Sequence, residues 1–144
     1  MTDRREPIAS RPHMPGYGIA EDTSGLLPWS WAEERLTACR NYWIITVNAD
    51  GSPHAMPVWG VWQDGGFLFG TGERSRKARN IARDPRIVVA TEGGDEPIVL
   101  HGVAVRVTES DTMAPFLEAY ERKYDWGAGE SSDDTNSDND PMFL

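Results

Sequence analysis

The stretch from residue 67 to residue 80 combines the residue types and the spacing of an anion-binding site. Its sequence, FLFGTGERSRKARN, leads from an apolar strand through two glycines into a short predicted helix. The first amides of a helix have no partners within the helix and lie at the positive end of its dipole, so a phosphate can bind there. The sequence therefore predicts a phosphate site at this junction.

Basic and hydroxyl side chains crowd the same junction. Arg76 and Lys77 fall in the first helical turn, where a cation is unfavourable by a few tenths of a kcal/mol, and a bound phosphate would remove that conflict. Thr71 and Ser75 add hydroxyl donors, and Asn80 follows one turn later. The alternative is that the basic side chains point into solvent and pair with the acidic excess of the chain. The residues alone leave both interpretations open.

The overall charge restricts the partners of this site. The chain has 144 residues, with 14 Lys and Arg against 23 Asp and Glu, and a net charge of −9. This balance argues against a general binder of nucleic acid or of anionic membranes. However, six of the 14 basic residues lie between positions 74 and 86, whereas seven acidic residues lie between 121 and 144. The expected anion site is thus a local cationic segment in an acidic chain.

Several other kinds of chemistry have no matching pattern. The single cysteine, Cys39, excludes a disulfide framework and a cysteine-rich metal cluster, and no metal ligands are predicted. Paired carboxylates at helical spacing, paired histidines and a serine nucleophile elbow are all missing from the sequence. No apolar run reaches the roughly 20 residues of a membrane helix, and the N-terminus has no signal-peptide pattern. We expect a soluble, cytoplasmic protein that contacts neither membranes nor nucleic acids.

The elements that must position the anion site are mostly short strands. Turn signals and β-branched or aromatic runs predict strands over 42–48, 54–62, 67–71, 86–92 and 97–107. Apolar residues at helical spacing predict helices over 30–40, 75–83 and 113–124, the first with a capping box of Ser30 and Glu33. This order favours a mostly β fold with short helices, a small antiparallel barrel.

The two ends of the chain have a different composition from this middle part. Residues 1–28 contain several Pro and Gly without a clear period and predict an extended arm, so the barrel domain is placed at 29–126. The segment 127–144 consists of an acidic loop, GAGESSDDTNSDND, followed by an apolar end, PMFL. The loop cannot bury enough apolar surface to become ordered, whereas the apolar end is expected to return to the body or to precede a further strand.

Two motifs taken together resemble a known family. The segments DGSPHAMPVW (50–59) and FGTGERSRKARNIARDPRIV (69–88) are similar to those of the pyridoxamine 5′-phosphate oxidase-like split β-barrel superfamily. Within that superfamily they most resemble the flavin/deazaflavin oxidoreductases that use coenzyme F-420. The resemblance runs from about residue 31 to residue 107. Members of the family continue beyond a segment like PMFL into a last strand, so the resemblance does not include a contribution from that strand.

The resemblance implies a function and a set of site residues. It implies a homodimer whose cofactor, coenzyme F-420 or alternatively FMN, lies in a groove between the subunits and exchanges hydride with a small-molecule acceptor. The implied phosphate ligands are Ser75, Arg76, Lys77 and Asn80, together with Thr71 from the anion site. The implied ring contacts are Met56, Pro57, Val58 and Trp59. A non-catalytic protein that binds a flavin, a deazaflavin or haem is the alternative from another class.

Some residues outside these motifs could also act on a ligand. Six tryptophans are many for this length, and packing in a core or dimer face explains each of them except Trp59, which shares a predicted strand with the implied ring contacts. His54 and His101 could polarise a substrate carbonyl, but a single histidine in a strand is more often structural. No catalytic residue is therefore assigned from the sequence.

Overall fold

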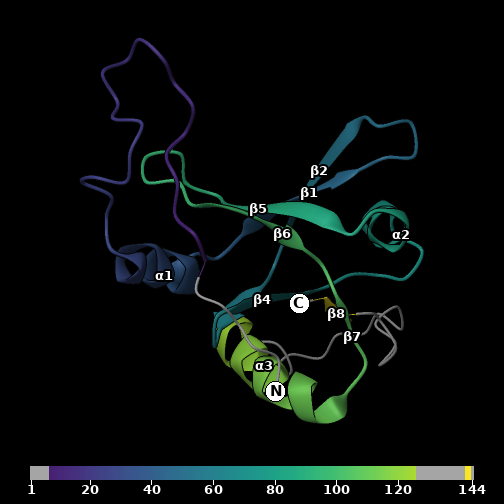
Figure 1. Ribbon diagram of the computed structural model, residues 1–144. Coiled ribbons are helices and arrows are strands. Elements are labelled where there is room, and N and C mark those ends of the chain that lie inside the picture. Colours follow the sequence, from purple (N-terminus) through teal and green to yellow (C-terminus); the bar gives the residue numbers. More distant parts are fainter. Residues whose placement is uncertain (1–6, 126–141, 144) are drawn as a thin grey trace.

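The computed structural model describes residues 7–125 and 142–143, which form two four-stranded antiparallel sheets and three helices (Figure 1). The strands are β1 (Tyr42–Val47), β2 (Pro53–Val58), β3 (Val61–Gln63), β4 (Gly66–Gly70), β5 (Arg86–Thr91), β6 (Val99–Val103), β7 (Arg106–Val107) and β8 (Met142–Phe143). The helices are α1 (Trp29–Ala38), α2 (Arg76–Arg83) and α3 (Ser110–Tyr124). The predicted class, mostly antiparallel β with short helices, is confirmed.

The chain passes between the two sheets at two sharp corners and once more through α2, which connects β4 to β5. The first sheet has the order β2-β1-β5-β6 and the second has the order β3-β4-β8-β7. Trp59 and Gly60 link β2 to β3, and Ala104 and Val105 link β6 to β7. In the second sheet, the apolar chain end pairs with both β4 and β7, so it does return to the body of the protein.

The corners correct two sequence predictions. The expected strands 54–62 and 97–107 are each two strands, because the chain turns sharply between the sheets. A Cβ atom at Gly60 would lie 2.2 Å from Cζ of Phe67, so only glycine fits at the first corner without a rearrangement. The spacing of apolar residues did not reveal this turn, because the turn depends on the contact between Gly60 and Phe67 of β4, a strand further along the chain.

The capping box predicted for the first helix is also wrong. The helix begins at Trp29 after Pro28 and has no side-chain cap, so Ser30 lies inside its first turn. The carboxylate of Glu33 instead accepts a hydrogen bond of 3.2 Å from the indole nitrogen of Trp62. This bond ties α1 to the second sheet. The predicted start of α2 is confirmed, since Ser75 accepts a hydrogen bond from the Ala78 amide.

The core lies between the sheets, with helices closing the ends. Tyr42 and Ile44 from β1 and Phe67 and Phe69 from β4 are buried together, and Leu36 of α1 packs against them. On the second sheet, Phe116 of α3 packs against Val61 and Leu68. α2 crosses near the β1–β2 hairpin, whereas α3 covers the lower side of the second sheet in Figure 1.

The segment before α1 forms a loop that projects from the body (Figure 1). Its two limbs are tied by Arg11, whose guanidinium donates to the carbonyl oxygens of Asp22 and Ser24. The predicted acidic loop falls on residues 127–140, which are outside the described residues. No helix among the described residues has both the length and the apolar character needed to cross a membrane.

Candidate functional site

A pocket of about 390 Å³ lies where the end of β2, the end of β4 and the start of α2 meet. Its lining residues are Asn41, Pro57, Val58, Trp59, Gly70, Thr71, Lys77 and Tyr120. Five of these were predicted as cofactor ligands from two motifs that are about a dozen residues apart in the sequence. The fold therefore brings the two motifs to one pocket, whose lining includes both a cation and aromatic side chains.

Lys77 is the cation of this pocket. Its side chain is half-buried, and it makes no hydrogen bond or ion pair with any residue that the structure describes. Burial lowers the pKa of Lys77 below its ordinary value, because the charged amine loses water without gaining a partner. A half-buried cation without a protein counter-charge is the arrangement expected where an anionic ligand binds.

The loop before α2 places hydroxyl groups beside this lysine. The Thr71 and Ser75 hydroxyl oxygens are 3.0 Å apart, and the Ser75 oxygen also caps the helix by accepting from the Ala78 amide at 3.1 Å. Ser75 is thus part of the helix cap rather than of the pocket wall. The amides of Arg76 and Lys77 in the first turn remain available, as helix geometry requires.

Apolar and aromatic residues also line the pocket. Pro57 and Val58 end β2, and the ring of Trp59, which is 38% exposed, follows them at the corner. Tyr120 of α3 faces Trp59 with a ring-centroid distance of 6.4 Å. Nearby, the side-chain amide of Asn41 donates to Glu92 at 2.9 Å, and this bond lowers the pKa of Glu92. The lining of the pocket thus combines planar aromatic side chains with one cation.

The remaining predicted ligands lie outside the pocket lining. Met56 comes before Pro57 in β2 and is 45% exposed, and it is not among the residues that line the pocket. Arg76 is exposed at the start of α2, on the side of Asp50, whose pKa it helps to lower after the larger effect of the Ser52 hydrogen bonds. Both side chains could approach a ligand only from outside the lining described here.

Asn80 has a structural position in this chain. It is fully buried, and its amide nitrogen donates to Thr46 Oγ1 and to Asn48 Oδ1, each at 3.0 Å. Its oxygen accepts from Arg83 at 3.3 Å. All its hydrogen-bonding groups have partners within the protein, so Asn80 joins α2 to β1 and is not placed to contact a ligand.

Three lining residues were not predicted from the sequence. Asn41 follows α1, Gly70 ends β4 and Tyr120 belongs to α3, so each comes from an element outside the two motifs or at their edge. Tyr120 lies on the periodic apolar face of its helix, which by itself indicates only burial. No local signal separates a tyrosine that lines a pocket from one that fills a core.

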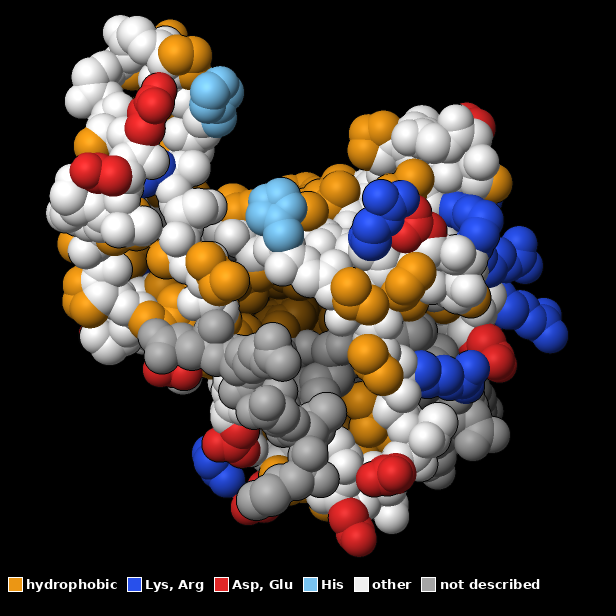
Figure 2. All heavy atoms as spheres, viewed as in Figure 1, with side chains coloured by type: hydrophobic (Ala, Val, Ile, Leu, Met, Phe, Trp, Pro, Cys, Tyr) orange, Lys and Arg blue, Asp and Glu red, His pale blue; other side chains and the backbone are white. Residues whose placement is uncertain are grey.

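The surface charge agrees with this location. Lys and Arg side chains gather at the right of the molecule in Figure 2, over the region of α2. The exposed basic residues there include Arg74, Arg76 and Arg79. Among the described residues, no group of three His, Cys, Asp or Glu side chains is placed to hold a metal ion. The site is therefore cationic through its side chains.

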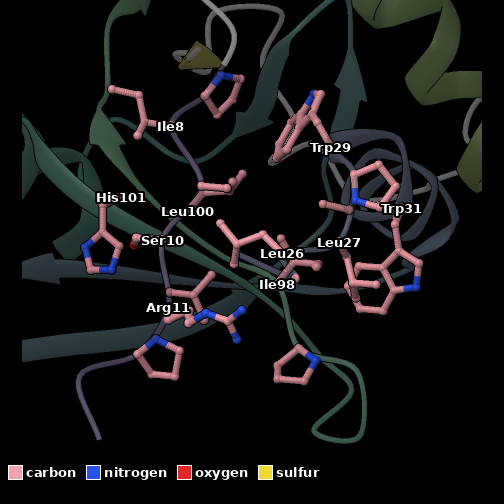
Figure 3. Close-up of a pocket in the computed structure, with 18 residues that line it drawn as sticks. Ile8, Ser10, Arg11, Leu26, Leu27, Trp29, Trp31, Ile98, Leu100 and His101 are labelled. Atoms are coloured by element: carbon pink, nitrogen blue, oxygen red, sulfur yellow. The ribbon is translucent and has the colours of Figure 1, made fainter. Parts of the chain in front are cut away.

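A larger hollow of about 840 Å³ lies under the projecting loop, between α1 and β6 (Figure 3). Apolar side chains such as Leu26, Leu27 and Ile98 line it, with His101 at its edge. Its charged lining residue, Arg11, already donates to the carbonyl oxygens of the loop. Because polar groups do not converge there, we place the candidate site at the smaller cationic pocket.

The other predicted histidine, His54, has a buried Nδ1 atom without a partner in the described structure.

Comparisons with known proteins agree with this fold. The family model for pyridoxamine 5′-phosphate oxidase matches residues 31–141. A curated pyridoxine/pyridoxamine 5′-phosphate oxidase from Kineococcus radiotolerans is 33% identical over 75 residues, covering 51% of this chain and 34% of that enzyme. The chain thus spans about a third of the length of this curated relative.

Solved structures share the fold at lower identity. A conserved hypothetical protein from Mycobacterium tuberculosis superposes with a TM-score of 0.68 at 22% identity, over 82% of this chain and 79% of that one. An F-420 reductase superposes with a TM-score of 0.60 at 21% identity, over 77% of this chain and 87% of that one.

The fold is that of the pyridoxamine 5′-phosphate oxidase-like split barrels, as the resemblance implied. With the family model matching most of its length, the chain belongs to the pyridoxamine 5′-phosphate oxidase family.

Proposed function

We propose that this protein is an oxidoreductase that binds a phosphate-bearing flavin or deazaflavin, foremost coenzyme F-420 and alternatively FMN, in the pocket lined by Lys77 and Trp59. The observation that carries the proposal is the half-buried amine of Lys77, which has no partner among the described residues, in a pocket that Trp59 and Tyr120 also line. A phosphate group and a planar ring are the two chemical parts that such a pocket complements.

The residues present fit a group of this kind. Lys77, the Thr71 hydroxyl and the first amides of α2 would hold the phosphate, while Pro57, Val58 and Trp59 would contact the ring. Ser75 supports Thr71, and Arg76 is near enough in sequence to screen the outer side of the phosphate. In this proposal, the second motif of the family resemblance binds the phosphate and the first motif contacts the ring.

The bound cofactor would supply hydride transfer to or from a small organic acceptor. The chain itself would fix the phosphate through Lys77 and Thr71 and limit the approach of water to the ring through Pro57 and Trp59. None of the pocket-lining side chains is a carboxylate or a histidine. In this proposal the lining residues therefore position the cofactor and do not transfer protons.

Titration of the purified protein with coenzyme F-420 and, separately, with FMN tests this proposal through the fluorescence of each cofactor. We expect micromolar or tighter binding of one of them and oxidation of its reduced form by organic acceptors. Binding without turnover of any acceptor would favour a carrier or storage protein. If the folded protein binds neither cofactor at micromolar concentration, the proposal is wrong.

Replacement of Lys77 by alanine gives the sharpest local test. We expect the affinity for the preferred cofactor to fall by about 1 to 3 kcal/mol, the scale of a lost charge-assisted hydrogen bond. The melting temperature should not fall, because the lysine has no partner among the described residues. Arg79→Ala, the same change of charge at an exposed position of α2, is the control and should retain the affinity. Equal dissociation constants for wild type and Lys77→Ala would place the anion elsewhere.

We also propose that the protein acts as a homodimer formed through the outer face of the first sheet. This face is defined by the register of its strands and consists of Trp43, Ile45, Val47, Pro53, Ala55, Pro57, Val88, Ala90, Val99 and Val103, with His101 and Arg86. The exposed fraction reaches 42% for Trp43 and 60% for Val103. The charge of Arg86 is paired with Asp84, and most of the other residues on this face are apolar. A large exposed apolar face is expected of a surface that a partner covers.

The substitution Trp43→Glu should separate the two subunits. A charge at this exposed position leaves the core of the monomer intact but is costly inside a buried interface. We expect the dimer dissociation constant to rise by about 30-fold or more, the scale of a tryptophan hot spot. Sedimentation velocity measures this change, with Arg122→Glu on α3 as the control. A monomeric wild type would contradict the proposed dimer.

A further inference from the structure

The corner between β2 and β3 is held by α3 through both polar groups of one glycine. The amide of Gly60 donates to the Tyr124 hydroxyl at 2.9 Å, and its carbonyl oxygen accepts from Lys123 Nζ at 3.1 Å. The Tyr124 hydroxyl also lies 2.6 Å from the carbonyl oxygen of Arg40, to which it can donate. Gly60 is buried, so its backbone amide and carbonyl groups cannot bond to water and depend on these hydrogen bonds instead.

The same contacts set the position of the neighbouring Trp59 ring. Trp59 stacks on Tyr124 with a centroid distance of 4.6 Å and an interplanar angle of 8°. Tyr120 packs against Tyr124 at 5.0 Å and, with Trp59, lines the cationic pocket. We call these three rings, Trp59, Tyr120 and Tyr124, the aromatic wall. Two of its three members come from a helix that neither motif includes.

Lys123 connects this wall to the core. Its amine donates to the Tyr42 hydroxyl at 2.7 Å, and Tyr42 in turn donates to the carbonyl oxygen of Leu36. The amine also lies over the rings of Tyr42 and Tyr124, at 4.7 and 5.3 Å from their centroids. Lys123 is not among the lining residues of the pocket, so it can influence a ligand only through Gly60 and the wall.

The electrostatic surroundings of Lys123 fit an anchoring role. Burial is the main cause that lowers the pKa of Lys123 to about 8; Arg40 also lowers it, whereas Cys39 and Glu92 act in the opposite direction. Burial likewise raises the pKa of Tyr124 and raises that of Tyr120 to about 12, so both phenols remain neutral near pH 7. The cluster therefore holds the Lys123 amine among neutral hydrogen-bonding rings, and the Arg40 guanidinium is a second cation beside them, 5.7 Å from the Trp59 centroid and 5.5 Å from the Tyr124 centroid.

We infer that Lys123 and Tyr124 are positioning residues that fix the Trp59–Gly60 corner, and that the resulting aromatic wall selects a planar ring as the group that stacks in the pocket. The identity of the ligand in this inference rests on the proposed function. The positioning of Trp59 does not depend on that function. Because one face of Trp59 is already covered by Tyr124, the two rings form a rigid platform and Trp59 cannot rotate away from the pocket without losing that stacking.

The test uses Lys123→Met and Tyr124→Phe in the full chain. The first keeps the aliphatic packing and removes the donors to Gly60 and Tyr42; the second keeps the ring and removes the hydroxyl. Arg122→Met is the matched control, since its side chain is 73% exposed and pairs only with Glu118 among the described residues. Thermal melting confirms that each variant is folded.

The first readout needs no ligand. The fluorescence of Trp59 is obtained by subtracting the emission spectrum of a Trp59→Phe variant from that of each protein. Acrylamide quenching of this difference measures the solvent accessibility of Trp59. We expect quenching of Trp59 to increase in Lys123→Met and Tyr124→Phe and to stay unchanged in Arg122→Met. Unchanged quenching in both test variants would overturn the inference, whether or not any cofactor binds.

The second readout is the affinity for FMN and for coenzyme F-420. We expect it to weaken by about tenfold in Lys123→Met, the scale of one lost anchoring hydrogen bond, and to remain at the wild-type value in Arg122→Met. Wild-type affinity in a variant with altered Trp59 quenching would overturn the selective role of the wall. Failure of the wild type to bind either cofactor would refute the proposed function and the ring selection, leaving the quenching result to decide the positioning role.

Discussion

The substitution Gly60→Ala is expected to lower the free energy of unfolding by about 2 to 3 kcal/mol, the upper part of the range for overpacking a core. A Cβ atom at this position would lie 2.2 Å from Cζ and 2.6 Å from Cε2 of the buried Phe67 ring, and 3.1 Å from the carbonyl oxygen of Leu68. Phe67 cannot move freely, because its ring packs against Tyr42 at 4.6 Å and against Phe69 at 6.1 Å.

The same substitution should also affect the pocket. A displaced corner would shift Trp59 and weaken the bonds from Lys123 and Tyr124 to the Gly60 backbone. Urea unfolding measures the stability, and cofactor titration of the folded fraction measures the binding. Gly93→Ala is a suitable control, because a Cβ atom there meets nothing within 4 Å and the residue lies outside the proposed phosphate site. Equal midpoints of unfolding for Gly60→Ala and wild type would contradict the expected clash.

The substitution Asn80→Ala is expected to lower stability by about 2 to 3 kcal/mol, because it leaves buried polar groups without partners. Thr46 is almost fully buried and would lose the hydrogen bond from the Asn80 amide, and Asn48 would lose one as well. The contact between α2 and the β1–β2 hairpin would weaken with them. Denaturant unfolding measures this loss, and Arg79→Ala on the same helix serves as the stable control.

Asn80→Ala and Lys77→Ala should therefore have opposite effects. The first is expected to lose stability while its folded fraction keeps most of its cofactor affinity; the second is expected to lose affinity and keep its stability. A fully stable Asn80→Ala variant with strongly weakened binding would instead restore Asn80 as a ligand, as the family resemblance implied.

The sequence was sufficient for much of the fold because the relevant signals are local. The Asp50-Gly51 turn and the flanking β-branched residues predict the hairpin of β1 and β2, and Ser75 predicts the start of α2. The glycines and basic residues between Thr71 and Lys77 also indicate, within a few positions, where the proposed phosphate site lies. In these cases the residue types and their neighbours in the chain suffice to set the backbone conformation.

The sequence was insufficient wherever a residue's role depends on a contact with a distant element. A continuous apolar run from 54 to 62 gives no sign of the corner at Gly60, whose cause is the ring of Phe67. Glu33 looks like the end of a capping box, yet it accepts a bond from Trp62 on another element. Tyr120, Lys123 and Tyr124 follow an ordinary helical pattern, and their importance appears only when α3 packs behind the β2–β3 corner.

The amino-acid sequence by itself determined the class of the fold and a cationic junction that suits a phosphate. The tertiary structure decided which of the basic side chains of α2 and which tryptophan line the cationic pocket, and which asparagine is structural. The physical reason is that charge and hydrogen-bonding capacity are properties of a residue, whereas burial and partners are properties of the packed chain. Lys77 and Asn80, three positions apart on one short helix, received opposite roles because one faces the pocket and the other faces β1.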